Sequence, residues 1–278
     1  MGAEGQDRTR RVIFHLGLPK TGSTTIQEMM RLNAATLAAE GVTVSPRDAL
    51  SQGLRKAAVA FTRSGGALAH ARHRLALWRF GRRARALGAP CLLVSDENIL
   101  GTESARLFAD RGALDFGALA LEIERAIGPG VDCRHVVYLR GRESWRASAY
   151  NQTVKKAKHI EDYPAWCARN ADLSGPDRIV EQLRAALGER LRVVEMEAEL
   201  ASGAPLGAAV LAECDVAPDT LAALQLPRQR NVSLPPAALE FIRVLGQRGI
   251  RGRTHRKVAT VVKENAHLFT AAPKDRAG

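Results

Sequence analysis

The segment 11–25, RVIFHLGLPKTGSTT, constrains the fold more than any other part of this chain of 278 residues. It starts with a short apolar run typical of a strand, continues through a loop rich in Gly and Pro, and reaches Ser23, which can begin a helix. Such a connection directs backbone N–H groups and the positive end of a helix dipole toward one point. The segment therefore predicts an anion-binding loop in an α/β protein.

The glycines of this loop have the spacing of a GxxxxGK[ST] phosphate-binding loop, but the lysine is displaced. Gly17 and Gly22 match the two glycines, Ser23 follows Gly22 directly, and Lys20 lies inside the loop. In the standard loop, the lysine after the second glycine reaches the β- and γ-phosphates of the nucleotide. The displacement therefore indicates a cradle adapted to a different and shorter anionic chain.

Apolar runs typical of strands alternate with longer segments of helical periodicity, which predicts a parallel sheet covered by helices. The expected strands are Val12–Leu16, Cys91–Val94, His135–Leu139 and Leu191–Met196, with a weaker one at Val42–Val44. The expected helices are Ser23 to about Glu40, one through Leu68 and Trp78, Phe116–Ile127, Arg142 to about Lys158, and Pro176–Leu187, followed by a mostly helical C-terminal region. The predicted fold class is α/β.

We expect one domain over residues 11–270, because 278 residues with 46% hydrophobic content suffice for one large core. Residues 1–10 and 271–278 are polar without periodicity and are expected to be disordered tails. No apolar run approaches the roughly 20 residues of a membrane helix, and the N-terminus lacks the apolar stretch of a secretory signal. The expected location is cytoplasmic.

The cysteines are widely separated and contain no CxxC pair. They are Cys91, Cys133, Cys167 and Cys214. This spacing favours free thiols over a disulfide framework, and we expect no metal site.

The chain is strongly basic, with a formal net charge of +12, which points to anionic partners. No acidic residue lies between Asp48 and Asp96, and a second acid-free patch follows near the C-terminus. The basic residues of the first run are Arg55, Lys56, Arg63, Arg72, Arg74, Arg79, Arg82, Arg83 and Arg85, and those of the second are Arg248, Arg251, Arg253, Arg256 and Lys257. Each is either a solvated surface or a surface for an acidic polymer or a membrane. Nucleic acid is disfavoured, because neither patch interleaves its charges with stacking aromatic rings.

A second segment with chemical content is HVVYLRGRESWRASAYNQTVKK, residues 135–156. Arg140 ends an expected strand, and Ser148 lies eight residues later in the helix expected to follow. Together with PKTGSTT at 19–25, this pair resembles the cofactor-binding signature of the P-loop sulfotransferases, which use 3′-phosphoadenosine 5′-phosphosulfate as sulfuryl donor. The resemblance implies a three-layer fold like that of P-loop NTPases, with a central parallel sheet flanked by helices.

The resemblance also implies a role for each matching residue. In that family the loop binds the 5′-phosphosulfate, its lysine contacts the bridging oxygen, and the Arg-x7-Ser pair holds the 3′-phosphate. The corresponding positions here are Pro19, Lys20, Thr21, Gly22, Ser23, Thr24, Thr25, Arg140 and Ser148. The donor leaves as adenosine 3′,5′-bisphosphate, and no metal is required.

The match is closest to bacterial members whose loop reads H-x-G-x-P-K-[TS]-G-[TS] and whose second motif reads Y-L-R followed by S-x-Y-N-Q-x-V-K. The residues that complete it here are His15, Tyr150, Asn151, Gln152 and Lys155. A late segment, Arg230 to Leu234, also resembles a motif of this group and extends the similarity over residues 11–245. Arg230 and Asn231 are then expected near the nucleotide, unless this loop caps the following helix through Ser233.

Sulfuryl transfer needs a base that accepts the acceptor's proton. In this family the base is a histidine or a carboxylate. Asp96 and Glu97 end the strand that precedes the Arg140 strand along the chain, where the crevice of such sheets opens, and we favour Glu97. The alternative is that Asp96 caps a turn and Glu97 is merely exposed. His15 and His159 are further candidates for the base, although His15 lies within a strand.

The predicted function is transfer of a sulfuryl group from this nucleotide donor to an acceptor hydroxyl or amine. The relatives and the basic patches suggest a carbohydrate or glycoconjugate acceptor, such as a lipid-linked precursor, and peripheral contact with a membrane surface. One alternative is a P-loop kinase that uses ATP and magnesium, since LLVSD resembles a strand ending in a magnesium-binding aspartate. The other is a non-catalytic protein that binds nucleotides or polyanions. The sequence predicts no oligomeric state.

Overall fold

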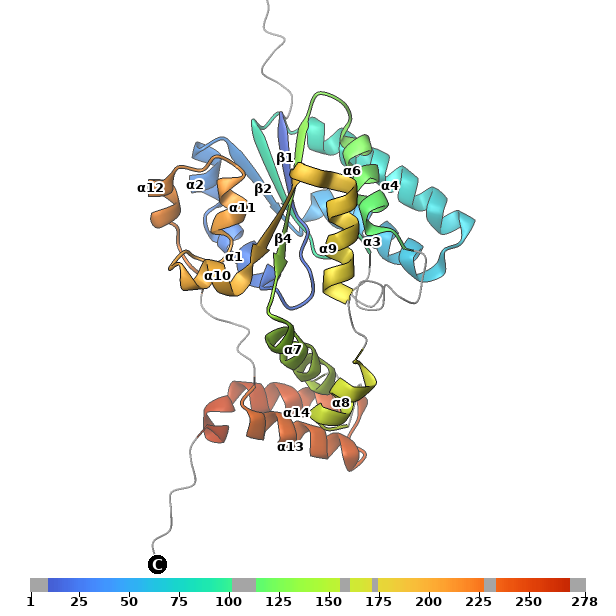
Figure 1. Ribbon diagram of the computed structural model, residues 1–278, viewed down its shortest axis with the longest axis vertical. Coiled ribbons are helices and arrows are strands. Elements are labelled where there is room, and N and C mark those ends of the chain that lie inside the picture. Colours follow the sequence, from blue (N-terminus) through green and yellow to red (C-terminus); the bar gives the residue numbers. More distant parts are fainter. Residues whose placement is uncertain (1–9, 102–113, 156–160, 172–174, 228–233, 271–278) are drawn as a thin grey trace, which may run out of the picture. The chain divides into compact units, whose positions relative to one another are not determined.

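The computed structural model describes residues 10–101, 114–155, 161–171, 175–227 and 234–270 (Figure 1). Contacts divide the chain into two compact units. Unit 1 comprises Met1–Gly141 and Leu173–Arg228, and unit 2 comprises Arg142–Asp172 and Gln229–Gly278. One domain over residues 11–270 stays a prediction.

Unit 1 contains a five-stranded sheet in which every pairing is parallel (Figure 1). Its strands are β1 (Arg11–His15), β2 (Val42–Pro46), β3 (Cys91–Ser95), β4 (Asp132–Leu139) and β5 (Leu191–Glu195), in the order β2-β3-β1-β4-β5. All five expected strands are confirmed, with small shifts at their ends. Because β1 is the central strand, the loop that follows it opens at the middle of the carboxyl edge.

Helices cover both faces of this sheet, so the expected three-layer α/β fold is confirmed. The elements over one face are α3 (Ala49–Ser64), α4 (Ala67–Arg85), α6 (Phe116–Ile127) and α9 (Gly175–Leu187). Those over the other are α1 (Ser23–Leu32), α2 (Ala34–Ala39) and α11 (Ala208–Ala212). The remaining helical elements of unit 1 are η2 (Gly188–Arg190), α10 (Met196–Ala201) and α12 (Pro218–Ala222).

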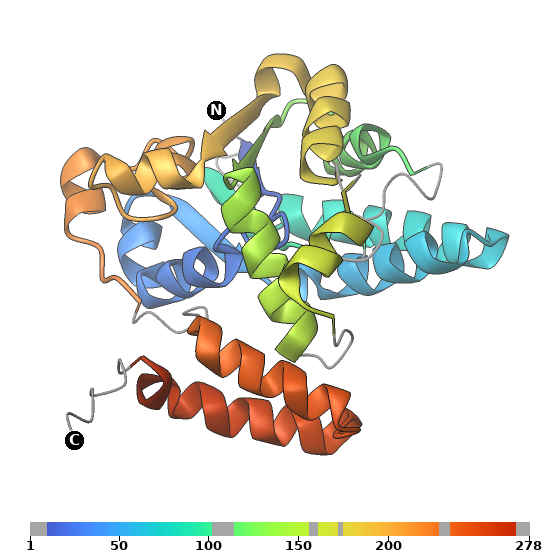
Figure 2. The same cartoon turned by 60° about the horizontal axis from the view of Figure 1, so that its bottom comes forward.

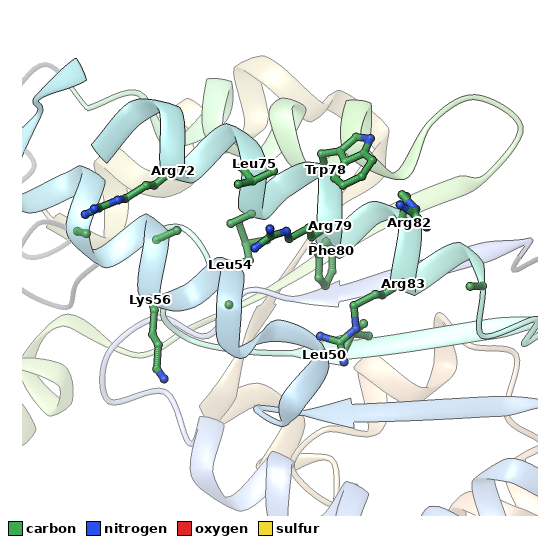
Figure 3. A pocket seen from close by; sticks show the side chains of 15 residues that line it. Leu50, Leu54, Lys56, Arg72, Leu75, Trp78, Arg79, Phe80, Arg82 and Arg83 are labelled. Carbon is green, nitrogen blue, oxygen red and sulfur yellow. The ribbon is translucent and has the colours of Figure 1, made fainter. Parts of the chain in front are cut away.

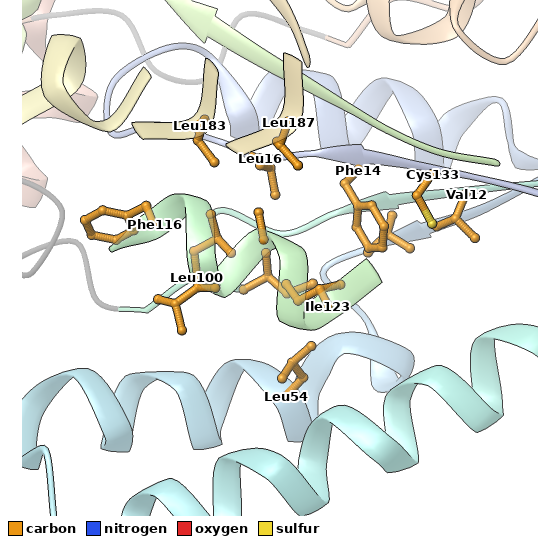
Figure 4. Packing of buried hydrophobic residues seen from close by; sticks show 14 of the residues in the cluster. Val12, Phe14, Leu16, Leu54, Leu100, Phe116, Ile123, Cys133, Leu183 and Leu187 are labelled. Carbon is orange, nitrogen blue, oxygen red and sulfur yellow. The ribbon is translucent and has the colours of Figure 1, made fainter. Parts of the chain in front are cut away.

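The core of unit 1 follows from the period-2 alternation of the strands. In β1, Val12 and Phe14 pack into the α3–α4–α6–α9 layer (Figure 4), whereas Ile13 packs against α1 and α11. All three side chains are almost completely buried. Since both faces of β1 are packed, the strand is held firmly beneath the loop that follows it.

The single helix expected from Ser23 to about Glu40 is wrong, because Asn33 interrupts it. The Asn33 side chain is buried and donates to the carbonyl oxygens of Met29 (2.8 Å) and Gln225 (2.9 Å). Its Oδ1 accepts from the Gln225 N–H at 2.8 Å. Asn33 therefore ends α1 and ties this junction to the segment after α12.

Unit 2 is helical, as expected for the C-terminal region. Its elements are α7 (Arg142–Lys155), α8 (Tyr163–Arg169), α13 (Pro236–Gln247), α14 (Gly252–Glu264) and η3 (Ala266–Phe269). The helices α13 and α14 lie side by side (Figure 2), and α7 contacts both. The rings of Tyr150, Tyr163 and Trp166 pack together and join α7 to α8. Among the described residues of both units, no helix is long and apolar enough to cross a membrane.

Candidate active site

The loop at residues 16–22 is anchored at both of its ends. The Leu16 N–H donates to the Val136 carbonyl at 3.0 Å and so extends the pairing of β1 with β4. Thr21 is buried, and its Oγ1 donates to the Leu18 carbonyl at 2.8 Å. Between these anchors Lys20 has a φ of 67°, a left-handed conformation that is rare for a residue with a side chain. The lysine is thus held in a fixed turn.

Both glycines of the loop are required by close contacts. A Cβ on Gly17 would lie 2.4 Å from Ser23 Oγ and 2.9 Å from the Cβ of Glu97. Gly22 has a φ of 79°, and a Cβ there would lie 2.4 Å from Leu206 Cδ2. The spacing that is visible in the sequence therefore reflects a loop pressed against α1, the end of β3 and the segment before α11.

The first turn of α1 has the properties of an anion-binding helix terminus. The Gly22 carbonyl accepts from the N–H groups of Thr25 (2.8 Å) and Ile26 (3.2 Å), so the helix begins directly at the loop. No acidic residue lies in the first turn, and the glycine cap has no side chain to accept a hydrogen bond. Ser23 is only 5% exposed, and its Oγ has no hydrogen-bond partner among the described residues. A bound anion would satisfy this buried hydroxyl.

The two carboxylates at the end of β3 have different environments, and Asp96 is completely enclosed. Its Oδ2 accepts from Ser51 Oγ at 2.7 Å and from Arg55 Nη1 at 2.6 Å. Its Oδ1 accepts from the Asn98 N–H at 3.1 Å, which is the turn-capping geometry that the sequence offered as an alternative. Asp96 therefore fastens α3 to the end of β3.

Glu97 lies beside the loop and remains partly accessible. Its side chain is 27% exposed, and its Cβ lies so close to Gly17 that a methyl group on that glycine would collide with it. Arg47 Nη1 donates to Glu97 Oε1 at 2.7 Å, and the Arg47 N–H donates to the Ser95 carbonyl at 2.8 Å. Sequence reasoning missed Arg47, which directly follows β2 at the carboxyl edge because that strand extends to Pro46, beyond the expected Val42–Val44.

His15 is packed inside the sheet and is poorly suited to act as a base. Its side chain is 1% exposed, Nδ1 lies 2.8 Å from Ser95 Oγ, and the ring meets the Tyr138 ring edge-on. Burial lowers the pKa of His15 to about 4. The imidazole is therefore neutral near pH 7, and its contacts orient the ends of β1 and β3.

Arg140 reaches the lysine loop from the end of β4. Its Nη1 donates to the Lys20 carbonyl at 3.3 Å, and its Nε lies 3.7 Å from Glu197 Oε1. Glu197 Oε2 also accepts from the Gly141 N–H at 3.2 Å. Two segments that are far apart in the sequence thus meet at one edge of the sheet, namely PKTGSTT and YLRG. This is expected for the ends of adjacent parallel strands.

Buried Glu199 supports this edge and was not found from the sequence. It accepts from Tyr138 Oη at 2.9 Å and from the N–H groups of Gly207 (2.9 Å) and Ala209 (2.8 Å). Burial and the neighbouring Glu199 carboxylate raise the pKa of Tyr138, which keeps the phenol as a donor. These bonds fix the segment whose Leu206 packs on Gly22. No motif in the sequence marks Glu199, which lies on α10 after β5, as a residue that supports the loop.

The remaining predicted site residues lie near the loop, on α7, or outside the described residues. Pro19 is buried, Thr25 is half-buried and Thr24 is exposed, all within the loop and the first turn of α1. Ser148 is buried on α7 in unit 2, and Asn151 on the same helix has a buried Oδ1 without a hydrogen-bond partner among the described residues. His159, Arg230 and Asn231 lie outside the described residues.

Metal ligation is not suggested by the part of the chain that the structure describes. No group of three or more His, Cys, Asp or Glu side chains there could hold an ion. Among these residues the cysteines are free thiols, and burial raises the pKa of Cys133 to about 12, so its thiol stays protonated. The arrangement at the carboxyl edge instead combines an anion-binding turn with the cations Lys20, Arg47 and Arg140 and the partly accessible carboxylates Glu97 and Glu197.

Comparison with known proteins gives one similar structure. The crystal structure of a sulfotransferase from Alicyclobacillus acidocaldarius aligns at 11% sequence identity with a TM-score of 0.44, covering 90% of this chain and 99% of that one. No family model matches the sequence, and no curated protein matches it. A functional assignment therefore depends on the residues of the chain itself.

Proposed function

We propose that this chain is a sulfotransferase that takes a sulfuryl group from 3′-phosphoadenosine 5′-phosphosulfate and gives it to an acceptor hydroxyl or amine. The observation that carries the proposal is the loop between β1 and α1, in which Lys20 is displaced into the turn and Arg140 donates to the Lys20 carbonyl. A triphosphate-binding lysine after the second glycine is absent from the sequence, where Ser23 stands.

The residues at the loop fit an anionic sulfated nucleotide. There is no space for side chains at Gly17 and Gly22, so backbone groups can approach a ligand closely. The buried Ser23 Oγ has no hydrogen-bond partner among the described residues, and such a ligand would supply one. Arg140 would hold the 3′-phosphate together with Ser148. When bound, the donor supplies an activated sulfuryl group whose leaving oxygen lies on the 5′-phosphate.

The chain's own side chains would then act on the two ends of the transfer. Glu97 would accept the proton of the acceptor hydroxyl as the hydroxyl oxygen forms the new S–O bond, and the ion pair with Arg47 would orient the carboxylate. Lys20 would stabilise the negative charge on the bridging oxygen as the old S–O bond breaks. Positioning and electrostatics would supply most of the rate, as in phosphoryl transfer.

The acceptor is proposed to be a carbohydrate or glycoconjugate, including a lipid-linked precursor. The basis is the resemblance of the two motifs to bacterial family members and the basic surface of unit 1, which suits an acceptor with anionic groups. A cytoplasmic location and the approach of Arg230 and Asn231 to the nucleotide are part of the same proposal.

A kinase is disfavoured by the environment of Asp96. The aspartate that would bind magnesium is fully buried and accepts hydrogen bonds from Ser51, Arg55 and Asn98, which occupy both of its oxygens. A divalent ion there would meet a carboxylate whose charge is already paired with Arg55. The Asp96 carboxylate thus holds α3 through Ser51 and Arg55.

Ligand-induced thermal stabilisation separates the three candidate functions. A ligand present at about 100 times its dissociation constant adds about 2.7 kcal/mol of stability. We expect adenosine 3′,5′-bisphosphate to raise the Tm and ATP with magnesium to leave it unchanged. Stabilisation by ATP with magnesium alone would indicate the kinase, and no effect of either ligand would indicate a non-catalytic protein without a working nucleotide site. Transfer of ³⁵S from labelled donor to a panel of glycan acceptors then tests the reaction itself.

A further inference from the structure

The α3–α4 hairpin of unit 1 has an outer surface that is both basic and apolar (Figure 3). We define the α3–α4 face by Lys56, Arg72, Leu75, Trp78, Arg79 and Arg82, which border a groove of about 850 Å³ between the two helices. Leu50, Leu54 and Phe80 line the same groove. The combination differs from an ordinary solvated helix face, because large apolar side chains stand exposed among the charges.

The apolar part of this face is well exposed. Trp78 is 52% exposed and Leu75 is 45% exposed, and Leu68 lies toward the start of α4 at 64%. Arg82 places its guanidinium carbon 4.8 Å from the centre of the Trp78 ring. Spacings of three, four and seven residues along α4 bring these side chains onto the same side of the helix.

The charges on the face are available to a partner. Within the same helices, Arg55 is paired with Asp96, while Arg83 and Arg85 donate to the carbonyls of Ala49 (3.1 Å) and Ile127 (2.7 Å). Those three arginines support the fold. For Lys56, Arg72 and Arg79, by contrast, the described residues provide no ion-pair partner, and the sequence has no acid from 49 to 95.

We propose that the α3–α4 face docks on the surface of an anionic lipid bilayer. Clustered Lys and Arg are attracted to acidic headgroups, Trp favours the interface between headgroups and acyl chains, and Leu adds buried apolar area. Arg72 and Arg79 can extend along apolar surface while their guanidinium groups remain with the headgroups. A nucleic acid would use stacking rings in series, whereas α4 exposes a single tryptophan on this face.

The tryptophans of the chain provide a direct probe of this docking. Of the three, Trp145 and Trp166 are 3% and 4% exposed and lie in unit 2, so a change of polarity on binding affects Trp78 first. Vesicles of equimolar phosphatidylcholine and phosphatidylglycerol should shift the emission of the full chain to shorter wavelength. Vesicles of phosphatidylcholine alone should not. The Trp78→Phe variant should still co-sediment with anionic vesicles but lose most of the shift.

Charge reversal on the face supplies the sharper comparison. We expect Arg72→Glu/Arg79→Glu to weaken binding to the anionic vesicles about tenfold or more, because two attractive charges become repulsive. The matched control is Arg253→Glu/Lys257→Glu on α14, which changes the net charge equally at exposed positions of unit 2 and should retain most of the binding. Circular dichroism establishes that both variants are folded.

Three outcomes would overturn the docking proposal. Equal loss of binding in the two charge-reversal variants would assign the attraction to net charge, and absence of binding to anionic vesicles would remove it altogether. The third outcome is a concentration-dependent dimer, seen by sedimentation velocity without lipid and abolished by Trp78→Ser, which would assign the face to a second copy of the chain. None of these readouts depends on sulfuryl transfer.

Discussion

At the scale of single residues, the position of Lys20 in a left-handed turn leads to the first prediction. Lys20→Ala should lower the rate of transfer from the sulfated nucleotide by at least about 10²-fold, because the leaving oxygen loses its cation. Lys20→Asn is the matched control for the backbone, since asparagine tolerates a φ near 67°. Both variants should still be stabilised by adenosine 3′,5′-bisphosphate. A Lys20→Asn enzyme with wild-type turnover would refute the proposed mechanism.

Glu97 leads to a second prediction, which separates it from its neighbour. Glu97→Gln should lower kcat by about 10²-fold or more with little change in Tm, because a partly exposed base is lost without disturbing the packing. Asp96→Asn is the comparison: breaking the buried pair with Arg55 should cost about 3–5 kcal/mol of stability. Steady-state kinetics and thermal melts measure both. Full turnover in Glu97→Gln would remove Glu97 as the base.

The buried His15 imidazole predicts a pH dependence of stability. Its pKa is about 4 in the folded chain against 6.5 when exposed. As the pH falls, the unfolded chain therefore takes up a proton at this residue at a higher pH than the folded chain does. The free energy of unfolding should therefore fall by up to about 3 kcal/mol for this group between pH 7 and pH 4, and remain unaffected above pH 7. Urea melts across that range should show a shallower decline for His15→Gln. Burial also lowers the pKa values of His73 and His135, so part of the decline should remain.

At the scale of elements, the junction between α1 and α2 depends on the side chain of one residue. Asn33→Ala should cost about 1–3 kcal/mol, since the buried Asn33 side chain makes hydrogen bonds to Met29 and to Gln225 that are lost. The control is Glu40→Ala, which removes an exposed bond to Thr220 and should change stability by less than about 0.5 kcal/mol. Equal effects in denaturant melts would show that Asn33 does not hold this junction.

The elements also show how far local pattern can predict structure. The five strands follow from apolar, β-branched runs, and α6 begins and ends at Phe116 and Ile127 as its periodicity predicts. The break at Asn33 could not be predicted, because its partner Gln225 is distant in the sequence. For the same reason the site was predicted in part: the loop and Arg140 carry motifs, whereas Arg47, Glu197 and Glu199 acquire their roles only from the strands that the fold makes adjacent.

At the scale of the whole molecule, the proposed binding of the donor's 3′-phosphate depends on two residues from different elements, Arg140 after β4 and Ser148 on α7. If both residues bind the same 3′-phosphate, their effects on its recognition are coupled. Each of Arg140→Ala and Ser148→Ala should then reduce the preference for adenosine 3′,5′-bisphosphate over adenosine 5′-monophosphate, which lacks that group.

A double-mutant cycle tests this coupling by isothermal titration calorimetry with both nucleotides. The double variant should lose less selectivity than the sum of the two single losses in free energy, because the second substitution removes a partner that has already lost its contact. Thr153→Ala on α7 is a suitable control, since its hydroxyl bonds within the helix to the Tyr150 carbonyl. Additive losses would show that Arg140 and Ser148 act independently, and an unchanged preference in both single variants would remove the 3′-phosphate from the proposed site.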